Sequence, residues 1–223
     1  EGFKVHHQLP ILSDDSGVER SVWPEMWPLE YLQSIRHTAS YKLNFLNSPR
    51  GREGEYWKLE TFLYGELDTK VRTILSIDPA TTTKVKSDFT GLAIVSGGHV
   101  QKTDGTKIPA CEVKWALAVK LTGAELRKKV LEILEQWPEI GLVLTESNQG
   151  GSHWSAILYD LPVALEVIHQ VENKQVRAGT VLNHYERFRV LHTSELTKLE
   201  EQMTGFPRGI NDDLVAAVGT GVM

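Results

Sequence analysis

The distribution of apolar residues predicts a series of β-strands from residue 71 onward. Three of them follow one another with short connections, at residues 73–78, 91–95 and 112–121. In the third, apolar side chains at every second position give the pattern of a strand with one buried face. Pro79 ends the first strand directly after Asp78, because proline lacks the N–H that would continue the ladder. With a polar turn expected from Gly97 to Gly105, the three strands should form an antiparallel meander.

Helices and strands alternate in the second half of the chain. Apolar residues three and four apart predict a helix at 122–137, with Thr122 and Glu125 in the positions of a capping box. The short apolar run at 142–145 is typical of a strand buried on both faces, and it ends at Glu146. The remaining predicted elements are a helix at 153–159, a strand at 164–171, a helix at 194–203 and an apolar helix from 212. This order predicts an α/β fold with one mixed sheet, in which the meander is followed by parallel strands and crossover helices, with helices on both faces.

Residues 1–70 have a different pattern from the rest of the chain. Trp-Pro pairs precede a short amphipathic helix, and Pro28 suits a helix start because its missing N–H costs nothing there. The segment then becomes polar and glycine-containing at 51–54, and it carries no motif of catalytic chemistry. These features predict a connector or arm over residues 1–70 and a main domain over residues 71–223.

Composition narrows the class of protein. The 223 residues are 41% hydrophobic and 24% charged, which is ordinary for a globular chain with a sizeable core. No apolar run approaches the roughly 20 residues of a transmembrane helix. A single cysteine, Cys111, excludes an internal disulfide. The net charge of −5 argues against a general polyanion binder, so contact with nucleic acid must come from local clusters of basic residues.

Acidic residues stand at the ends of the elements that this topology brings together. A right-handed crossover places the strand at 142–145 beside the first strand and parallel to it, and neighbouring strands lie about 4.8 Å apart. Asp78 and Glu146 should then face each other at one rim of the sheet. Asp212 and Asp213 open the last helix, where one cap residue is enough and the second acid needs another explanation.

Carboxylates that converge on one point repel one another unless a cation neutralises them. Hard oxygen ligands with open positions suit Mg²⁺ or Mn²⁺. The chemistry that this predicts is hydrolysis of a phosphodiester by two metal ions, of which one activates the attacking water and the other stabilises the departing 3′ oxygen. The alternative interpretation assigns Asp78 to a polar turn, and Asp212 and Asp213 to helix capping.

Five segments of the main domain form a further pattern. They are Asp78-Pro79-Ala80, Ser87-Asp88-Phe89-Thr90, Glu146-Ser147-Asn148-Gln149-Gly150, Tyr185 to Val190 and Asn211 to Ala217. In this order and spacing they resemble the nuclease domain of tailed-phage terminase large subunits, which has the ribonuclease H-like fold. The resemblance implies that Asp78, Glu146 and Asp213 are catalytic and bind two ions of Mg²⁺ or Mn²⁺. Asp212 would be an alternative or additional ligand. Asp88 would either lie in the outer coordination sphere or cap the turn into the second strand.

The resemblance also implies an activity and a setting. The expected activity is that of an endonuclease that cleaves concatemeric viral double-stranded DNA during genome packaging, in the cytoplasm of the host cell. Besides DNA, the expected partners are a portal protein, a terminase small subunit and an ATPase domain, to which residues 1–70 would be the linker. The motif Gly-x-x-x-x-Gly-Lys-Ser/Thr does not occur in this sequence, which begins at Glu1 rather than at methionine. The ATPase is therefore expected to lie outside this chain.

Basic residues near the predicted rim are candidates for contact with DNA. They are Lys84, Lys86, Lys174, Arg177, Arg187 and Arg189. If their segments flank the same rim, they form a local phosphate clamp on an acidic protein, whereas as ordinary loop residues they are merely solvated. Two alternatives to a packaging nuclease stay open. One is a resolvase or transposase-like nuclease of the same fold, and the other is a docking domain whose carboxylates only cap helices and turns.

Overall fold

The computed structural model of the protein describes residues 8–14, 16–36, 38, 41, 44–46, 56–80, 89–121, 123–147 and 151–223, with the backbone alone at 151–153. The chain divides into two compact units, Glu1–Gly54 and Glu55–Met223. The pattern along the sequence predicts a division after residue 70. Residues 56–70 lie in the second unit, where Trp57 and Phe62 are buried.

The first unit has its own small apolar core. An antiparallel pair of strands, β1 (Ile11–Ser13) and β2 (Glu19–Ser21), precedes helix α1 (Leu29–Ile35). Pro28 stands directly before α1, as its sequence position predicts. The buried residues of this core are Ile11, Leu32, Ile35 and Tyr41.

The second unit is built on a seven-stranded sheet in the order β3-β9-β6-β5-β4-β7-β8. Its strands are β3 (Leu63–Tyr64), β4 (Thr69–Asp78), β5 (Thr90–Gln101), β6 (Lys107–Val119), β7 (Ile140–Glu146), β8 (Ala164–Ile168) and β9 (Val190–His192). The antiparallel strands β4, β5 and β6 form the predicted meander. Strands β7 and β8 extend the sheet in parallel beyond β4, and β9 and β3 extend it in parallel beyond β6. The predicted mixed sheet is confirmed.

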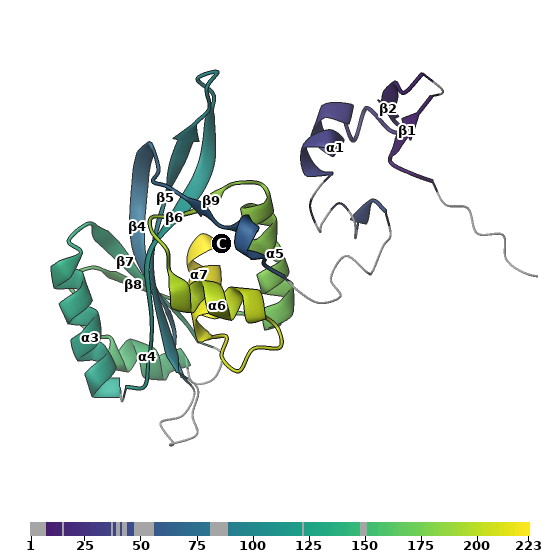
Figure 1. Ribbon diagram of the computed structural model, residues 1–223. Coiled ribbons are helices and arrows are strands. Elements are labelled where there is room, and N and C mark those ends of the chain that lie inside the picture. The colour runs from purple at the N-terminus through teal and green to yellow at the C-terminus, as the bar shows by residue number, and fades with distance from the viewer. Residues whose placement is uncertain are drawn as a thin grey trace, which may run out of the picture. The chain divides into compact units, whose positions relative to one another are not determined.

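Helices cover both faces of this sheet, as predicted (Figure 1). They are α3 (Gly123–Gln136), α4 (Gly151–Ile157), α5 (Lys174–Glu186), α6 (Thr197–Gly205) and α7 (Asp213–Val222), with a short 3₁₀ helix at Leu59–Thr61. Figure 1 shows α3 and α4 on one face and α5, α6 and α7 on the other. The predicted capping residue Thr122 lies outside the described residues. Among the helices that the structure describes, none is long and apolar enough to cross a membrane.

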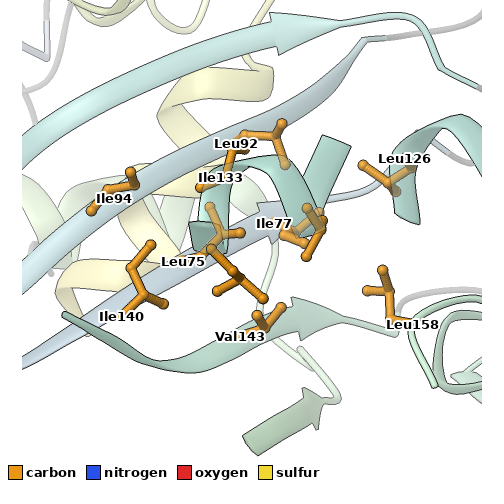
Figure 2. Close-up of a cluster of buried hydrophobic side chains, with 11 residues drawn as sticks. Leu75, Ile77, Leu92, Ile94, Leu126, Ile133, Ile140, Val143 and Leu158 are labelled. Atoms are coloured by element: carbon orange, nitrogen blue, oxygen red, sulfur yellow. The ribbon is translucent and has the colours of Figure 1, made fainter. Parts of the chain in front are cut away.

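The core under α3 holds the central strands in place. Leu75 and Ile77 of β4 are fully buried, and their alternation places them on the same face of the sheet. Figure 2 shows them among side chains of β5, β7 and α3, which include Leu92, Ile94, Val143, Leu126 and Ile133, and near Leu158, which follows α4. Each buried side chain of this size contributes about 1.5–3 kcal/mol. The end of β4, and with it Asp78, is therefore rigidly placed.

The prediction of a turn from Gly97 to Gly105 is wrong for its first residues. Gly97 and Gly98 lie within β5, and the chain turns only near Gly105, which has a φ of 85°. A Cβ atom on Gly98 would lie 1.9 Å from the carbonyl oxygen of Thr69 on β4. Glycine at this position therefore allows the close approach of two strands, and it does not mark a turn.

Candidate active site

Asp78 and Glu146 end two neighbouring strands. Strands β4 and β7 are parallel, and Ile77 of β4 pairs with Thr145 of β7. The next residues in each strand, Asp78 and Glu146, therefore lie side by side at one rim of the sheet. Both are buried, with 8% of Asp78 and 1% of Glu146 exposed. The topology thus produces the adjacency that the sequence predicts.

The first turn of α7 lies against the same rim. Gly91 of β5 pairs with Asp78, and a Cβ atom on Gly91 would lie 2.2 Å from the carbonyl oxygen of Asp213. Only a glycine at this position lets the helix approach so closely. Asp213 is buried beside the strand pair. Asp212 occupies the N-cap position of α7, but its side chain makes no capping hydrogen bond, so capping does not account for it.

Lys174 brings a positive charge to the rim from the first turn of α5. Asn173 caps this helix, because its side chain accepts a hydrogen bond from the N–H of Val176. The ammonium nitrogen of Lys174 lies 2.9 Å from Oδ1 of Asp212 and 3.8 Å from Oδ2 of Asp78. Burial lowers the pKa of Lys174, but the charges of Asp78, Asp212 and Asp213 and the hydrogen bond to Asp212 together raise it by more. Lys174 therefore stays protonated between the two carboxylates.

Arg177 lies one turn further along α5 and is buried. Its guanidinium donates a hydrogen bond to Glu146, and the hydroxyl of Thr220 in α7 donates to the same carboxylate oxygen. A buried carboxylate needs such partners, because an unpaired charge away from water is costly. Two helices, α5 and α7, therefore hold Glu146 in its position.

The acidity of Asp78 reflects this crowded rim. Burial raises the pKa of the Asp78 carboxyl to about 7, against the positive charge of Lys174. The negative charges of Glu146 and Asp213 raise this pKa further, and Arg177 lowers it. The charged form of Asp78 is thus disfavoured mainly by desolvation, and a cation bound beside it favours that form.

Five further residues were predicted for the site from the sequence. Three are outside the part of the chain that the structure describes: Lys84, Lys86 and Asp88. Arg187 and Arg189 follow the last residue of α5, whose 13 residues span about 20 Å. There they affect His184, whose pKa is lowered by burial and by both charges. The structure therefore brings Lys174 and Arg177 to the rim, while Arg187 and Arg189 lie at the opposite end of the helix.

Comparison with known proteins relates this fold to one group. No family model matches the chain, and no curated protein matches it either. The structure of a large terminase from a thermophilic bacteriophage matches 75% of this chain and 43% of its own, with a TM-score of 0.53 and 11% sequence identity. The same protein in complex with ATP-gamma-S gives a TM-score of 0.52 at 10% identity, over the same shares of both chains. This chain has a terminase-like fold.

A further structure, of the large terminase nuclease from thermophilic phage G20c with bound magnesium, matches 76% of this chain and 96% of its own. Its TM-score is 0.49 and its sequence identity 12%. The resemblance to ribonuclease H-like terminase nucleases that the five sequence segments indicate is confirmed at the level of the fold. The chain spans about 43% of the length of the first of these proteins, the large terminase.

The rim of this terminase-like fold offers the donors that a hard divalent cation prefers. Asp78, Glu146 and Asp213 supply buried carboxylate oxygens, and such oxygens suit Mg²⁺ or Mn²⁺. Among the described residues, no three acidic, histidine or cysteine side chains already converge as a metal cage. Instead, Lys174 and Arg177 pair with the carboxylates. The donor types therefore fit a divalent cation, although in this structure the carboxylates form ion pairs with Lys174 and Arg177.

Two rim residues of the terminase-like fold were not found from the sequence. Thr220 lies seven residues after Asp213, so the two residues share one face of α7 two turns apart. A polar residue at that spacing in an otherwise apolar helix is a signal that could have revealed it. Gly91 gives no such signal, because in the sequence it resembles any other glycine in a strand.

Proposed function

We propose that this chain is the nuclease domain of a phage terminase large subunit, a divalent-metal-dependent endonuclease. Its substrate is concatemeric viral double-stranded DNA, which it cleaves during genome packaging. The observation that carries the proposal is the meeting of Asp78, Glu146 and Asp213 at one rim of a terminase-like fold. The same fold can carry many different activities, so the support for a nuclease comes from these three side chains.

In this proposal Asp78, Glu146 and Asp213 hold two ions of Mg²⁺ or Mn²⁺, with Asp212 as an additional ligand. Support comes from the raised pKa of Asp78, which is caused first by burial and then by the negative charges of Glu146 and Asp213. When bound, the ions supply an activated water and stabilise the departing 3′ oxygen. Asp88 acts from the outer coordination sphere.

The basic residues of the rim position the carboxylates and the substrate. Arg177 and Thr220 fix the orientation of Glu146, so this side chain does not have to be ordered during the reaction. The side chain of Lys174 is 43% exposed, and it can exchange Asp212 for a phosphate oxygen of the DNA. Lys84 and Lys86 contribute further phosphate contacts from the segment between β4 and β5. Arg187 and Arg189 are too distant for this role.

The likeness to a large terminase also supports a proposal for the rest of the protein and for its partners. Other structures of the large terminase that this chain matches are complexes with ATP-gamma-S and with ADP, and this chain spans less than half of that protein. We therefore assign the unit Glu1–Gly54 to the link between an ATPase domain and the nuclease unit Glu55–Met223. The complete protein then works with a portal protein and a terminase small subunit in the cytoplasm of the host cell.

Nicking of supercoiled plasmid in the presence of Mg²⁺ or Mn²⁺ tests the proposal. The wild-type protein should nick the plasmid, and chelation of the metal should stop it. Asp78→Asn, Glu146→Gln and Asp213→Asn should each abolish nicking, since each removes one charged ligand. Glu135→Gln is the matched control, because Glu135 is an exposed residue of α3 and its loss should leave nicking unchanged. Undiminished nicking by Asp78→Asn or Glu146→Gln would overturn the assignment.

A non-catalytic docking domain is the second candidate. It is favoured by one observation, namely that Lys174 and Arg177 already pair with the carboxylates in the described part of the chain. A docking domain gains no thermal stability from Mn²⁺, whereas a metal-dependent nuclease gains stability in proportion to the logarithm of the free metal concentration. A separate comparison of branched and linear duplex DNA as substrates detects a resolvase-like enzyme, which would cut the branched DNA in preference.

A further inference from the structure

A cleft opens beside the N-terminus of α7. Its volume is about 420 Å³, which is within the range of sites that bind small molecules. Its walls come from α6, from the loop between α6 and α7, and from the ends of β5 and β6 near the rim. The residues on which the argument depends are Phe89, Ala118, Lys198, Gln202 and Leu214.

The cleft lies close to the candidate active site. Gly91 of β5 pairs with Asp78 on one side and with Ala118 of β6 on the other. Ala118 lines the cleft and therefore lies two strand spacings, about 10 Å, from Asp78. Leu214, the next residue after Asp213, lines it as well. When one phosphate of a DNA strand lies at the carboxylates, the next nucleotide of that strand therefore reaches the cleft.

The walls of the cleft have the chemistry of a nucleotide site. Phe89 is an aromatic wall, and the ammonium nitrogen of Lys120 lies 4.7 Å from the centre of its ring. Lys198 of α6 supplies a second positive charge, and Glu201 supplies one negative charge. Aromatic rings flanked by basic side chains bind successive bases and phosphates of single strands, because bases stack on the ring and phosphates pair with the cations. Positive charge here contrasts with the net charge of −5 of the chain.

The cleft is also held open by the fold. The side-chain oxygen of Gln202 in α6 accepts a hydrogen bond of 2.9 Å from the backbone N–H of Leu214 in α7. This bond ties α6 to the first turn of α7, so the wall of the cleft and the position of Asp213 are fixed together. Leu214 is fully buried, which anchors the bond in the core.

We propose that this cleft binds one unpaired nucleotide of the strand that is cut, next to the scissile phosphate, with its base against Phe89. The inference rests on the proposed nuclease function and adds a requirement on the substrate. A cleft of this volume has room for one nucleotide, and a base that stacks on Phe89 has to leave the duplex stack. Strands in which that base is already unpaired should therefore bind more tightly than intact duplex.

Binding of a short single-stranded oligothymidine, followed by fluorescence anisotropy without divalent metal, tests the inference. Phe89→Ala should weaken this binding about fivefold or more, because the base loses the ring on which it stacks. Phe89→Tyr keeps the ring and should bind like the wild type. Phe188→Ala is the control, because Phe188 is an exposed ring beyond the far end of α5. Lys198→Met should weaken binding and reduce its dependence on salt.

Two readouts separate the possible failures. If Phe89→Ala and Lys198→Met bind the oligonucleotide as tightly as the wild type, while the wild type nicks plasmid, the nucleotide cleft is wrong and the nuclease function stands. If the wild type neither binds the oligonucleotide nor nicks plasmid, the proposed function itself fails. Thermal unfolding of each variant shows whether a loss of binding reflects a loss of fold. If Phe89→Ala is unfolded, Phe89→Tyr, which restores the ring, tests the role of the ring in its place.

Discussion

Arg177 and Glu146 form a buried ion pair at the centre of the candidate site. Methionine in place of Arg177 keeps much of the side-chain volume but removes the charge, so Glu146 is left buried without that partner. We expect Arg177→Met to lower the free energy of unfolding by about 3–5 kcal/mol, the usual cost of breaking a buried pair on one side. Urea denaturation of the metal-free protein measures the change.

The half-buried pair of Lys129 and Glu132 on α3 provides the control for this prediction. Lys129→Met should cost at most about 1 kcal/mol, because water reaches this pair and screens it. If the carboxylate of Glu146 binds metal, Mn²⁺ should restore more stability to Arg177→Met than it adds to the wild type. Equal small losses in the two variants would contradict the role of the buried pair.

Asp78 should make the metal-free protein sensitive to high pH. Its pKa rises from 3.8 in the unfolded chain to about 7 in the folded protein. A group with a raised folded pKa contributes stability that is fully present below the unfolded pKa and is lost as the pH rises through the folded value. Asp78→Asn removes this titration. The variant should therefore gain several degrees in melting temperature over the wild type at about pH 8, with a much smaller difference at about pH 4.

Two further measurements accompany the melting curves of Asp78→Asn. Asp104→Asn in the exposed β5–β6 turn should show no such gain, because the pKa of Asp104 is lowered by hydrogen bonds to Thr106. Added Mn²⁺ should remove the advantage of Asp78→Asn, since it neutralises the wild-type carboxylate. A wild-type stability that stays constant from about pH 4 to about pH 8 would show that burial of Asp78 does not cost what its raised pKa implies.

At the residue scale, the sequence predicts the acids and also Lys174 and Arg177 near the rim, but it predicts these two as DNA contacts and not as partners of the carboxylates. Asp78 and Glu146 stand at the ends of apolar runs, and strand order and crossover handedness bring such ends together. Arg177 lies in a basic stretch without clear periodicity, and it is buried because Glu146, 31 residues earlier, accepts its hydrogen bond. No local pattern encodes a contact of that kind.

The contact between β5 and α7 can be tested at the scale of whole elements. A methyl group at Gly91 would collide with the backbone of Asp213, so Gly91→Ala should push the first turn of α7 away from the sheet. We expect a loss of about 1–3 kcal/mol in the free energy of unfolding, as for other overpacked sites. The stabilisation by Mn²⁺ should fall as well, because Asp213 moves away from Asp78. Thermal unfolding with and without metal measures both effects.

Gly97 is the matched control for Gly91→Ala within the same strand. A Cβ atom at Gly97 meets nothing within 4 Å, so Gly97→Ala should leave the stabilisation by Mn²⁺ unchanged. It should be neutral or slightly stabilising, since alanine loses less backbone entropy than glycine in a strand. If the two variants respond alike to Mn²⁺, the close approach at Gly91 does not position the metal ligands.

The strands at the far edge of the sheet show why some elements could not be predicted. Strands β3 and β9 have two and three residues, too few for an alternating pattern. Polar contacts join them to the helices: Nδ1 of His192 lies 2.7 Å from Glu200, and its Nε2 lies 2.9 Å from the hydroxyl of Tyr185. Tyr64 of β3 donates to the same Glu200. The long strands of the meander, in contrast, follow from apolar periodicity alone.

At the scale of the molecule, the net charge is negative, whereas basic residues gather near the N-terminus of α7. The chain carries a net charge of −5, yet Lys174 and Arg177 lie on one side of the α7 N-terminus, and Lys198 lines the cleft beside it. Binding to DNA through so few cations should be weak and sensitive to salt. An isolated nuclease unit is therefore expected to need a second DNA-holding part of the motor, which raises the effective concentration of the substrate.

The boundary between the two units decides which fragment folds. Trp57 is fully buried in the second unit, with its ring centre 6.0 Å from that of Tyr185 and 6.1 Å from that of Phe206. A fragment of residues 55–223 keeps these contacts and should unfold cooperatively, with the metal response of the full chain.

A fragment of residues 71–223, cut where the sequence pattern changes, loses Trp57 together with Phe62 and β3. It should be less stable by at least about 3–5 kcal/mol, the usual cost of removing one large buried aromatic side chain. Urea denaturation of both fragments measures the difference, and equal midpoints would place the boundary after residue 70.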